Sequence, residues 1–143
     1  MTLKINVGCG DKCKEGFEGV DKVNYGQEHV LDVEDTGLYP ILDESVDEIF
    51  SSHFLEHIRN IDYVMREFWR VLKKGGTAHI IVPYFRSEWA FRDPSHVRFF
   101  TENTFFYFNQ EYAKKVNYHT LCDFDIIKID VNGNEVEAWL KKR

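Results

Sequence analysis

The sequence predicts an α/β fold with a mostly parallel sheet that ends in an antiparallel hairpin. Two patterns carry this prediction. Between residues 3 and 82, short strand-like runs alternate with helical or irregular connections, an alternation typical of a parallel sheet. Near the end of the chain, Asn132-Gly133-Asn134 joins two further strand-like runs, and Asn-Gly is the strongest short hairpin signal. Strands joined so closely must pair antiparallel, so the sheet changes direction there.

The parallel part is predicted from five strand-like runs. They cover residues 3–7, 17–21, 29–33, 46–51 and 77–82. The clearest helix is predicted over residues 60–74, because Asn60 suits the N-cap, apolar residues recur at helical spacing, and Gly75-Gly76 suits a helix end. A second helix is predicted over residues 102–115, and the hairpin strands over residues 124–131 and 135–140.

Length and composition predict the general class of protein. The 143 residues suit a single domain, residues 1–143, that folds without a disulfide or metal staple. The three cysteines, Cys9, Cys13 and Cys122, suit neither a disulfide framework nor a four-ligand zinc site, so free thiols in a reducing compartment are expected. No apolar run approaches the roughly 18 residues of a membrane span, and no signal peptide is recognised, which predicts a cytoplasmic protein without membrane contact. The net charge of -6 argues against binding nucleic acid through phosphate neutralisation.

A glycine turn after the first strand-like run indicates the type of ligand. The turn reads Asn6-Val7-Gly8-Cys9-Gly10, and Asp21 closes the second run only eleven residues after Gly10. In a dinucleotide-binding unit, a full helix follows the turn and the ribose-binding acid lies about 20 residues on. Here the first helix has almost no room, so extended chain must return to the second strand. The spacing therefore favours a nucleoside ligand without phosphates, such as S-adenosylmethionine, over a pyrophosphate.

Acidic residues at the ends of two predicted strands are candidates for contacts with that nucleoside. Asp21, followed by Lys22, is either a solvated strand end or the carboxylate that binds the ribose hydroxyls. Asp32 lies where an adenine amino group would be met, but it could equally be loop solvation, as could its neighbours Glu34 and Asp35. In open α/β sheets, ligands bind outside the carboxyl ends of the strands, which supports the functional interpretation.

A more specific signature follows the fourth strand-like run. The segment reads Ser52-His53-Phe54-Leu55-Glu56-His57, and together with the glycine turn it resembles the class I S-adenosylmethionine-dependent methyltransferases. The resemblance is to a small branch with an Asn-x-Gly-Cys-Gly turn and a His-x-Leu-Glu-His signature, and it covers nearly the whole chain. It implies a Rossmann-like methyltransferase sheet, with the terminal hairpin as its sixth and seventh strands, and S-adenosylmethionine as cofactor.

The resemblance also implies roles for individual residues. Gly8, Cys9 and Gly10 would line the methionine and ribose side of the cofactor, Asp21 would hold the ribose, and Asp32 with the Val33 backbone would read the adenine. Ser52 and His53 would border the reactive sulfonium, and Lys22 is a further cofactor-binding candidate. The chain departs from the wider family in the missing first helix and in Lys12, which replaces the usual third glycine of the turn. How the methionine end is enclosed stays open.

The long segment after the fifth strand-like run, residues 84–101, is rich in aromatic residues. Loops of this length in a compact domain are usually functional. One interpretation makes the segment an acceptor pocket and lid, with His96 or Glu88 as candidate general base and His53 as a further catalytic candidate. The alternative makes it an aromatic cover over the sheet, which would account for Phe99, Phe100 and Phe105.

Metal binding is not predicted. His53 and His57 are four residues apart and could share one helical face as a metal pair, but the sequence offers no third ligand at a suitable spacing. His57 is equally explained by a hydrogen bond within the fold.

The expected function is therefore methyl transfer from S-adenosylmethionine to a small-molecule or metabolite acceptor. The alternative is a non-catalytic cofactor-binding or interaction module with the same fold, and a nicotinamide-dependent oxidoreductase ranks lower because of the short gap before Asp21. In so small a chain, the acceptor must be recognised by residues 84–101 or by a second subunit of a homo-oligomer.

Overall fold

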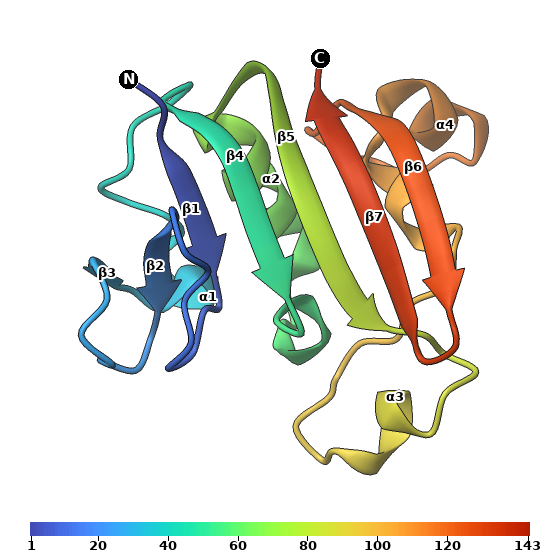
Figure 1. Ribbon diagram of the computed structural model, residues 1–143. Helices are drawn as coiled ribbons and strands as arrows, with labels where there is room; N and C mark the ends of the chain where they lie inside the picture. The colour runs from blue at the N-terminus through green and yellow to red at the C-terminus, as the bar shows by residue number, and fades with distance from the viewer.

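The computed structural model describes all residues from 1 to 143, and a seven-stranded sheet forms its centre (Figure 1). The strands run in the order β3-β2-β1-β4-β5-β7-β6. Their bounds are β1 Lys4–Val7, β2 Glu18–Asp21, β3 His29–Val30, β4 Val46–Ser52, β5 Leu72–Pro83, β6 Phe124–Asn132 and β7 Glu135–Lys142. The first five strands pair parallel, whereas β7 pairs antiparallel with both β5 and β6. The predicted parallel sheet with a terminal antiparallel hairpin is confirmed.

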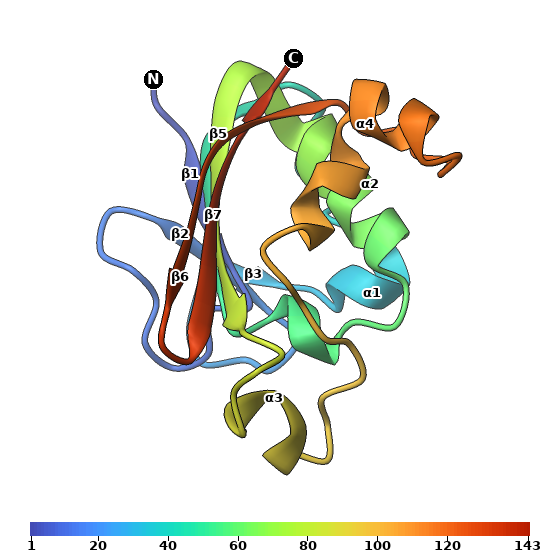
Figure 2. The same cartoon turned by 90° about the vertical axis from the view of Figure 1, so that its right-hand side faces the viewer.

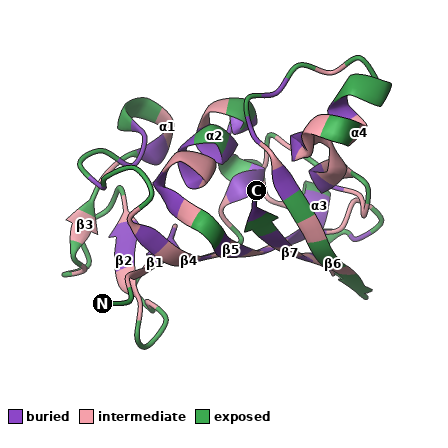
Figure 3. Ribbon diagram, turned by 90° about the horizontal axis from the view of Figure 1, so that it is seen from above, coloured by how far each residue is buried: buried purple, intermediate pink, exposed green.

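Helices α1, α2 and α4 are short and lie on one face of the sheet, as Figures 2 and 3 show, whereas α3 lies beyond the end of β5 (Figure 1). The helical segments are α1 Val33–Thr36, η1 Leu55–His57, α2 Ile61–Val71, α3 Trp89–Arg92, η2 Thr104–Phe108 and α4 Gln110–Lys115, of which η1 and η2 are 3-10 turns. Because only one face is covered, alternate strand residues such as Ala78, Ile80 and Val82 are fully buried. The side chains between them on β5, including His79, are half-buried.

The connection between β1 and β2 contains no helix, as the sequence predicts. Residues 8–17 instead form turns and bends, and the Asn6 side chain accepts a hydrogen bond from the Lys14 amide at 2.9 Å. Asn6 itself is buried. A single side chain of β1 thus anchors the returning segment where a helix would otherwise pack.

Two predicted helix boundaries are wrong. The helix predicted over 60–74 has its N-cap at Asn60 but ends at Val71, and β5 begins directly at Leu72. Leu72 is fully buried and pairs with Val46 of β4, so strand pairing outweighs the local helical tendency of the lysines that follow. The helix predicted over 102–115 is divided at Asn109, whose side chain caps Tyr112 and also donates to the Phe124 carbonyl at 2.8 Å.

The third strand is also shorter than predicted. It ends at Val30, and Val33 begins α1 because the Asp32 side chain accepts a hydrogen bond from the Glu34 amide at the N-cap position. Asp32 therefore lies at a helix start rather than at a strand end, but still beyond the carboxyl edge of the sheet.

Candidate functional site

Two cavities lie next to each other at the carboxyl ends of the parallel strands. The strand-end cavity, of about 400 Å³, lies beyond β1, β2 and the start of α1. The loop cavity, of about 720 Å³, lies between η1, the segment around α3 and the β6–β7 turn. His53 and His57 line both cavities. A molecule in one cavity would therefore be next to a molecule in the other.

The strand-end cavity contains most of the residues predicted to bind the cofactor. Its lining is Gly8, Val20, Asp21, Lys22, Leu31, Asp32, Val33, Glu34, His53, Phe54, His57, Ile58 and Ser95. Among these residues, Lys22 is the only lysine or arginine, and three carboxylates, those of Asp21, Asp32 and Glu34, line the same cavity. Such a cavity suits the hydroxyl groups and apolar base of a nucleoside, whereas the helix start that usually binds a pyrophosphate after the glycine turn is missing.

Asp21 positions the glycine turn. One oxygen of its carboxylate accepts a hydrogen bond from the Gly10 amide at 2.9 Å, and the other accepts from the Val23 amide at 3.0 Å. Gly8, at the other side of the turn, has a φ of 71°, and a Cβ atom there would lie 2.5 Å from the Phe54 ring. Only glycine allows this approach, so the cavity wall depends on its having no side chain.

Three of the predicted cofactor contacts, Cys9, Gly10 and Ser52, do not line the strand-end cavity. The Cys9 sulfur points back into the turn, where Sγ is 3.3 Å from the Gly10 carbonyl oxygen. Burial, followed by the neighbouring Cys13 and Asp21, raises the pKa of the Cys9 thiol to about 12. Cys9 therefore stays a thiol and is a poor nucleophile.

The loop cavity is polar rather than aromatic. Its lining is His53, Glu56, His57, Pro83, Trp89, Arg92, Asp93, His96, Asn132, Gly133, Asn134 and Glu135. Trp89 is its only aromatic residue outside the histidines, and the Arg92 guanidinium lies 3.9 Å from the centre of the Trp89 ring. His96 lines the cavity, whereas Glu88 is exposed and lines neither cavity.

The other aromatic residues of this segment divide into two groups. Phe100 and Phe105 are fully buried and stack with ring centres 5.6 Å apart, so they belong to the core. Phe91 and Phe99 stack on each other at 4.5 Å and remain exposed. The aromatic-cover interpretation therefore holds for Phe100 within residues 84–101 and for Phe105 just beyond them, and not for Phe99.

His53 is held between two carboxylates where the cavities meet. It follows β4 with a φ of 55°, its Nε2 lies 2.5 Å from Glu135 Oε2, and its Nδ1 lies 3.3 Å from Glu56 Oε2. These carboxylates, Glu56 first, outweigh burial and raise the pKa of His53. The charged form of the imidazole is therefore favoured at this position.

Sequence reasoning missed two site residues, Glu56 and Glu135. Glu56 is part of the His-Phe-Leu-Glu-His segment, but its almost complete burial against the loop cavity has no local sequence signal. Glu135 is 82 residues from His53 and reaches it because β7 pairs with β5, which places Glu135 opposite Pro83. The antiparallel hairpin was predicted from the sequence, but its pairing with β5 and this register were not.

Comparison with known proteins identifies a family to which the chain is similar. A family model described as "Methyltransferase domain" matches residues 6–80, just over half of the chain. No curated protein matches the sequence.

No helix of the structure is long and apolar enough to cross a membrane.

Solved structures share the fold over almost the entire chain. A SAM-dependent methyltransferase from Archaeoglobus fulgidus has a TM-score of 0.70 at 17% identity, covering 99% of this chain and 86% of the other. A SAM-dependent methyltransferase from Aquifex aeolicus has a TM-score of 0.63 at 14% identity, covering 99% and 82%. The [4+2]-cyclase SpnF has a TM-score of 0.67 at 14% identity, covering 99% and 74%.

Proposed function

Because this chain belongs to the family of methyltransferase domains and has their Rossmann-like sheet, we propose that it transfers a methyl group to a small polar acceptor. S-adenosylmethionine is the cofactor of this family. The observation that carries the proposal is the contact between two cavities, one suited to a nucleoside and one polar, which share His53 and His57. That arrangement suits a cofactor and an acceptor that meet at one atom.

The strand-end cavity would hold the cofactor. Asp21 would accept hydrogen bonds from the ribose hydroxyls, since its two oxygens are already fixed by backbone amides and retain free lone pairs. Asp32, with the Val33 backbone, would contact the adenine, while the absence of a side chain at Gly8 lets Phe54 pack directly against the glycine turn. Lys22 lines the same cavity. Cys9, Gly10 and Ser52 would act indirectly, through the shape of the turn and the end of β4.

The loop cavity would hold the acceptor. When bound, S-adenosylmethionine supplies an electrophilic methyl carbon on a sulfonium. The chain contributes alignment: placing an acceptor atom about 3 Å from that carbon is worth several kcal/mol before any acid or base acts. The residues available for this belong to residues 84–101 and to the β6–β7 turn of the same chain. Recognition of the acceptor therefore does not need a second subunit.

Two of the three catalytic candidates fit this cavity. His96 Nδ1 lies 3.0 Å from the Ala90 carbonyl oxygen, which can only accept, so Nε2 retains the lone pair available to a proton or another cation. His53 lies where the two cavities meet, between Glu56 and Glu135. Glu88 loses support as a base because it is exposed outside the cavity.

A reducing, cytoplasmic setting is part of the proposal. It is supported by three free cysteines, of which Cys122 is buried and Cys9 and Cys13 are partly buried. An oxidising compartment would expose these thiols to pairing and oxidation.

The first experiment is calorimetry with S-adenosylmethionine and S-adenosylhomocysteine, followed by an acceptor panel of small hydroxyl, amine and carboxylate compounds. We expect both cofactor forms to bind at micromolar concentration and S-adenosylhomocysteine to be released with at least one acceptor. Absence of binding by either form at millimolar concentration would sink the proposal. Binding of both without methyl transfer to any acceptor would favour the alternative, a cofactor-binding module without this activity.

A further inference from the structure

Three side chains of the loop cavity converge on one point. Glu56 and His57 belong to η1, His96 lies beyond α3, and their potential ligand atoms all lie within 4.8 Å of one another. We propose that Glu56, His57 and His96 bind a divalent transition-metal ion, with Zn²⁺ as the best match, in a site that opens into the loop cavity. The sequence concealed this trio, because His96 is far from the other two along the chain.

The Glu56 carboxylate is the strongest reason for a cation. Glu56 is 1% exposed, and neither of its oxygens has a hydrogen-bond partner. Two histidine nitrogens lie within 4 Å of Oε2, His53 Nδ1 at 3.3 Å and His96 Nε2 at 3.9 Å. Burying a carboxylate without hydrogen bonds costs several kcal/mol, so buried charges are normally paired or coordinate a metal. His53 is an ion-pair partner of Oε2 at 3.3 Å, but it makes no hydrogen bond to it, and a metal ion would supply the direct coordination that both Glu56 oxygens lack.

The hydrogen bonds of the two histidines leave the same ring nitrogen, Nε2, free on each. His96 Nδ1 donates to the Ala90 carbonyl oxygen at 3.0 Å, which leaves the lone pair on Nε2. His57 Nδ1 lies 3.0 Å from Ser95 Oγ, and the Ser95 hydroxyl donates to Asp93 at 2.7 Å. Ser95 Oγ must therefore accept from His57 Nδ1, which again leaves the lone pair on Nε2.

This pattern is the one found around metal-bound histidines. A ligating imidazole almost always donates its second N–H to a carbonyl, a carboxylate or a comparable acceptor, which fixes the ring and its tautomer. His96 uses a backbone carbonyl directly, and His57 uses Ser95 as a relay to the Asp93 carboxylate. Both orienting groups lie on the segment around α3, which thus holds the two rings with their centres 4.8 Å apart.

The donor set selects the ion. Two imidazoles and one carboxylate form a three-ligand set that suits Zn²⁺ and its neighbours, whereas Mg²⁺ and Ca²⁺ prefer oxygen donors alone. Zinc–nitrogen bonds of about 2.1 Å place tetrahedral donors about 3.4 Å apart, so the side chains need to move inward by about 1 Å. With three protein ligands, the fourth position is open to the cavity, as in catalytic rather than structural zinc sites.

The open position predicts the class of acceptor, and this part rests on the proposed function. A small molecule with a hydroxyl or carboxylate oxygen would complete the coordination of the ion, next to the strand-end cavity that His57 also lines. A Lewis acid at this point lowers the pKa of a bound hydroxyl. His96 would then act as a ligand, and not as a general base.

The test of the site is metal binding to the cofactor-free full chain. Protein treated with chelator is titrated with ZnCl₂ by calorimetry and with CoCl₂ by visible absorption. We expect one ion per chain with micromolar or tighter affinity, and a cobalt spectrum of four- or five-coordinate type. E56Q and H96A should each weaken Zn²⁺ binding at least a hundredfold. H79A is the matched control, because His79 is a half-buried histidine that pairs with Glu137 on the open face of the sheet.

Folding and cofactor binding are checked separately. His96 does not line the strand-end cavity, so H96A should retain the circular dichroism spectrum and the S-adenosylhomocysteine affinity of the wild type. Glu56 contacts His53, which lines that cavity, so E56Q is used only for metal binding, with circular dichroism as its check of folding. No binding of Zn²⁺ or Co²⁺ by the wild type would overturn the site, as would unchanged binding by both variants, equal loss in H79A, or a preference for Mg²⁺. Metal binding without S-adenosylhomocysteine binding would instead count only against the proposed function.

The acceptor class has its own readout. A chelator should abolish methyl transfer to a hydroxyl or carboxylate acceptor, Zn²⁺ should restore it, and S-adenosylhomocysteine affinity should not change. Full methyl transfer in the presence of chelator would refute the role of the ion in acceptor binding, while the binding site itself is judged by the titrations.

Discussion

At the scale of single residues, Asp21 connects the shape of the glycine turn to the chemistry of the cavity behind it. Its two carboxylate oxygens accept from the amides of Gly10 and Val23, on either side of the β2 end. The same carboxylate lines the strand-end cavity beside Lys22 and Asp32. Removing its charge therefore affects both the position of the turn and any ribose that binds there.

Replacing Asp21 by asparagine should weaken S-adenosylhomocysteine binding by about tenfold to a hundredfold, measured by calorimetry. An amide has one oxygen acceptor instead of two, and hydrogen bonds to a charged group are worth about 1.5–3 kcal/mol. Asp35→Asn is the matched control, since Asp35 is an exposed carboxylate of α1 outside the cavity. An affinity of Asp21→Asn equal to that of Asp35→Asn would exclude Asp21 from the ribose site.

The sequence was sufficient to predict those site residues whose positions follow from the ends of strands. Gly8, Asp21 and His53 come directly after β1, at the end of β2 and after β4, so a parallel sheet brings them to one edge. Glu135 and His96 could not be assigned in this way. Glu135 depends on the exact register of β7 against β5, and the ring orientation of His96 depends on a hydrogen bond to Ala90.

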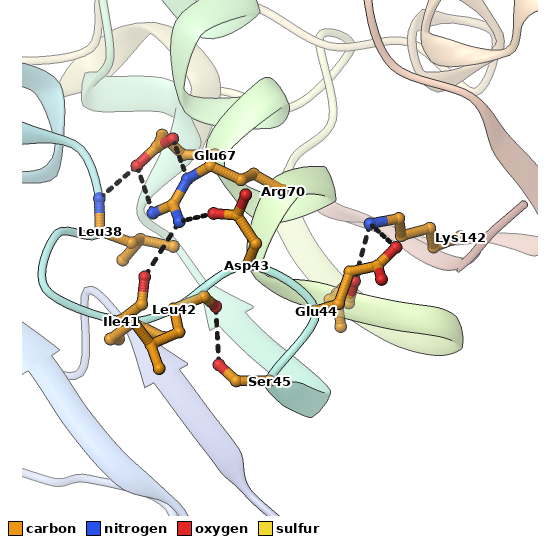
Figure 4. A network of polar contacts seen from close by, with 10 residues as sticks. Leu38, Ile41, Leu42, Asp43, Glu44, Ser45, Glu67, Arg70 and Lys142 are labelled. Carbon is orange, nitrogen blue, oxygen red and sulfur yellow. Dashed lines mark hydrogen bonds and ion pairs between the residues drawn. The ribbon is translucent and has the colours of Figure 1, made fainter.

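At the scale of elements, a network of hydrogen bonds around Glu67 connects the segment that precedes β4 to helix α2 (Figure 4). Glu67 accepts from the Leu38 amide at 2.7 Å and from Arg70 Nε at 2.7 Å. Arg70 in turn donates to the Ile41 carbonyl at 3.0 Å and to Asp43 at 2.6 Å. The irregular connection between α1 and β4 is therefore fixed by side chains of α2 rather than by secondary structure of its own.

Glu67→Ala should lower the free energy of unfolding at pH 7 by about 2 kcal/mol, measured by urea denaturation, because it leaves the Leu38 amide and Arg70 without their acceptor. Glu111→Ala serves as control. Glu111 is exposed and pairs with Lys115 at 3.9 Å, so its removal should cost less than about 0.5 kcal/mol. Equal effects of the two substitutions would show that the network does not stabilise the fold.

The contribution of Glu67 should depend on pH. Arg70 and the Leu38 amide outweigh burial and hold the pKa of Glu67 below its usual value of 4.5. A carboxyl whose pKa is lower in the folded state stabilises the fold above its unfolded pKa and loses this contribution as the pH falls through the folded value. The difference between wild type and Glu67→Ala should therefore shrink below about pH 4.5. A difference that grows toward pH 3 would contradict the assigned direction.

The two ends of helix α2 illustrate which helix boundaries can be predicted from the neighbouring sequence. Asn60 was predicted as the N-cap of α2, and its side chain accepts from the Tyr63 amide at 3.2 Å. The C-terminal end of α2 could not be predicted from the neighbouring sequence, because Leu72 leaves the helix to pair with Val46. Caps are formed by neighbouring residues and leave a sequence signal, whereas a helix that ends in strand pairing is decided by a distant partner.

At the scale of the whole molecule, the missing first helix changes which parts of the chain support the cofactor site. Helices α1, α2 and α4 lie on one face of the sheet (Figure 2), so the opposite face has no helix and is covered in part by residues 8–17, with Phe17 and Lys14 against Phe50. There His79 stacks on Trp139 at 4.6 Å, and Phe50 packs against His79 at 5.3 Å. The strand-end cavity is consequently built from loops and strand ends, and bound cofactor should contribute a large share of the total stability.

S-adenosylhomocysteine at 100 times its dissociation constant should raise the melting temperature by about 9 °C. A ligand that binds only the folded state adds about 2.7 kcal/mol at that concentration, and unfolding entropy for a chain of this length converts 1 kcal/mol to about 3 °C. Differential scanning fluorimetry measures the shift, with NADH as the comparison ligand. NADH should produce no shift, because the β1–β2 connection contains no helix whose N-terminal amides would bind a pyrophosphate. A shift with NADH equal to that with S-adenosylhomocysteine would mean that the cavity does accept a pyrophosphate, and that the missing helix does not select the cofactor.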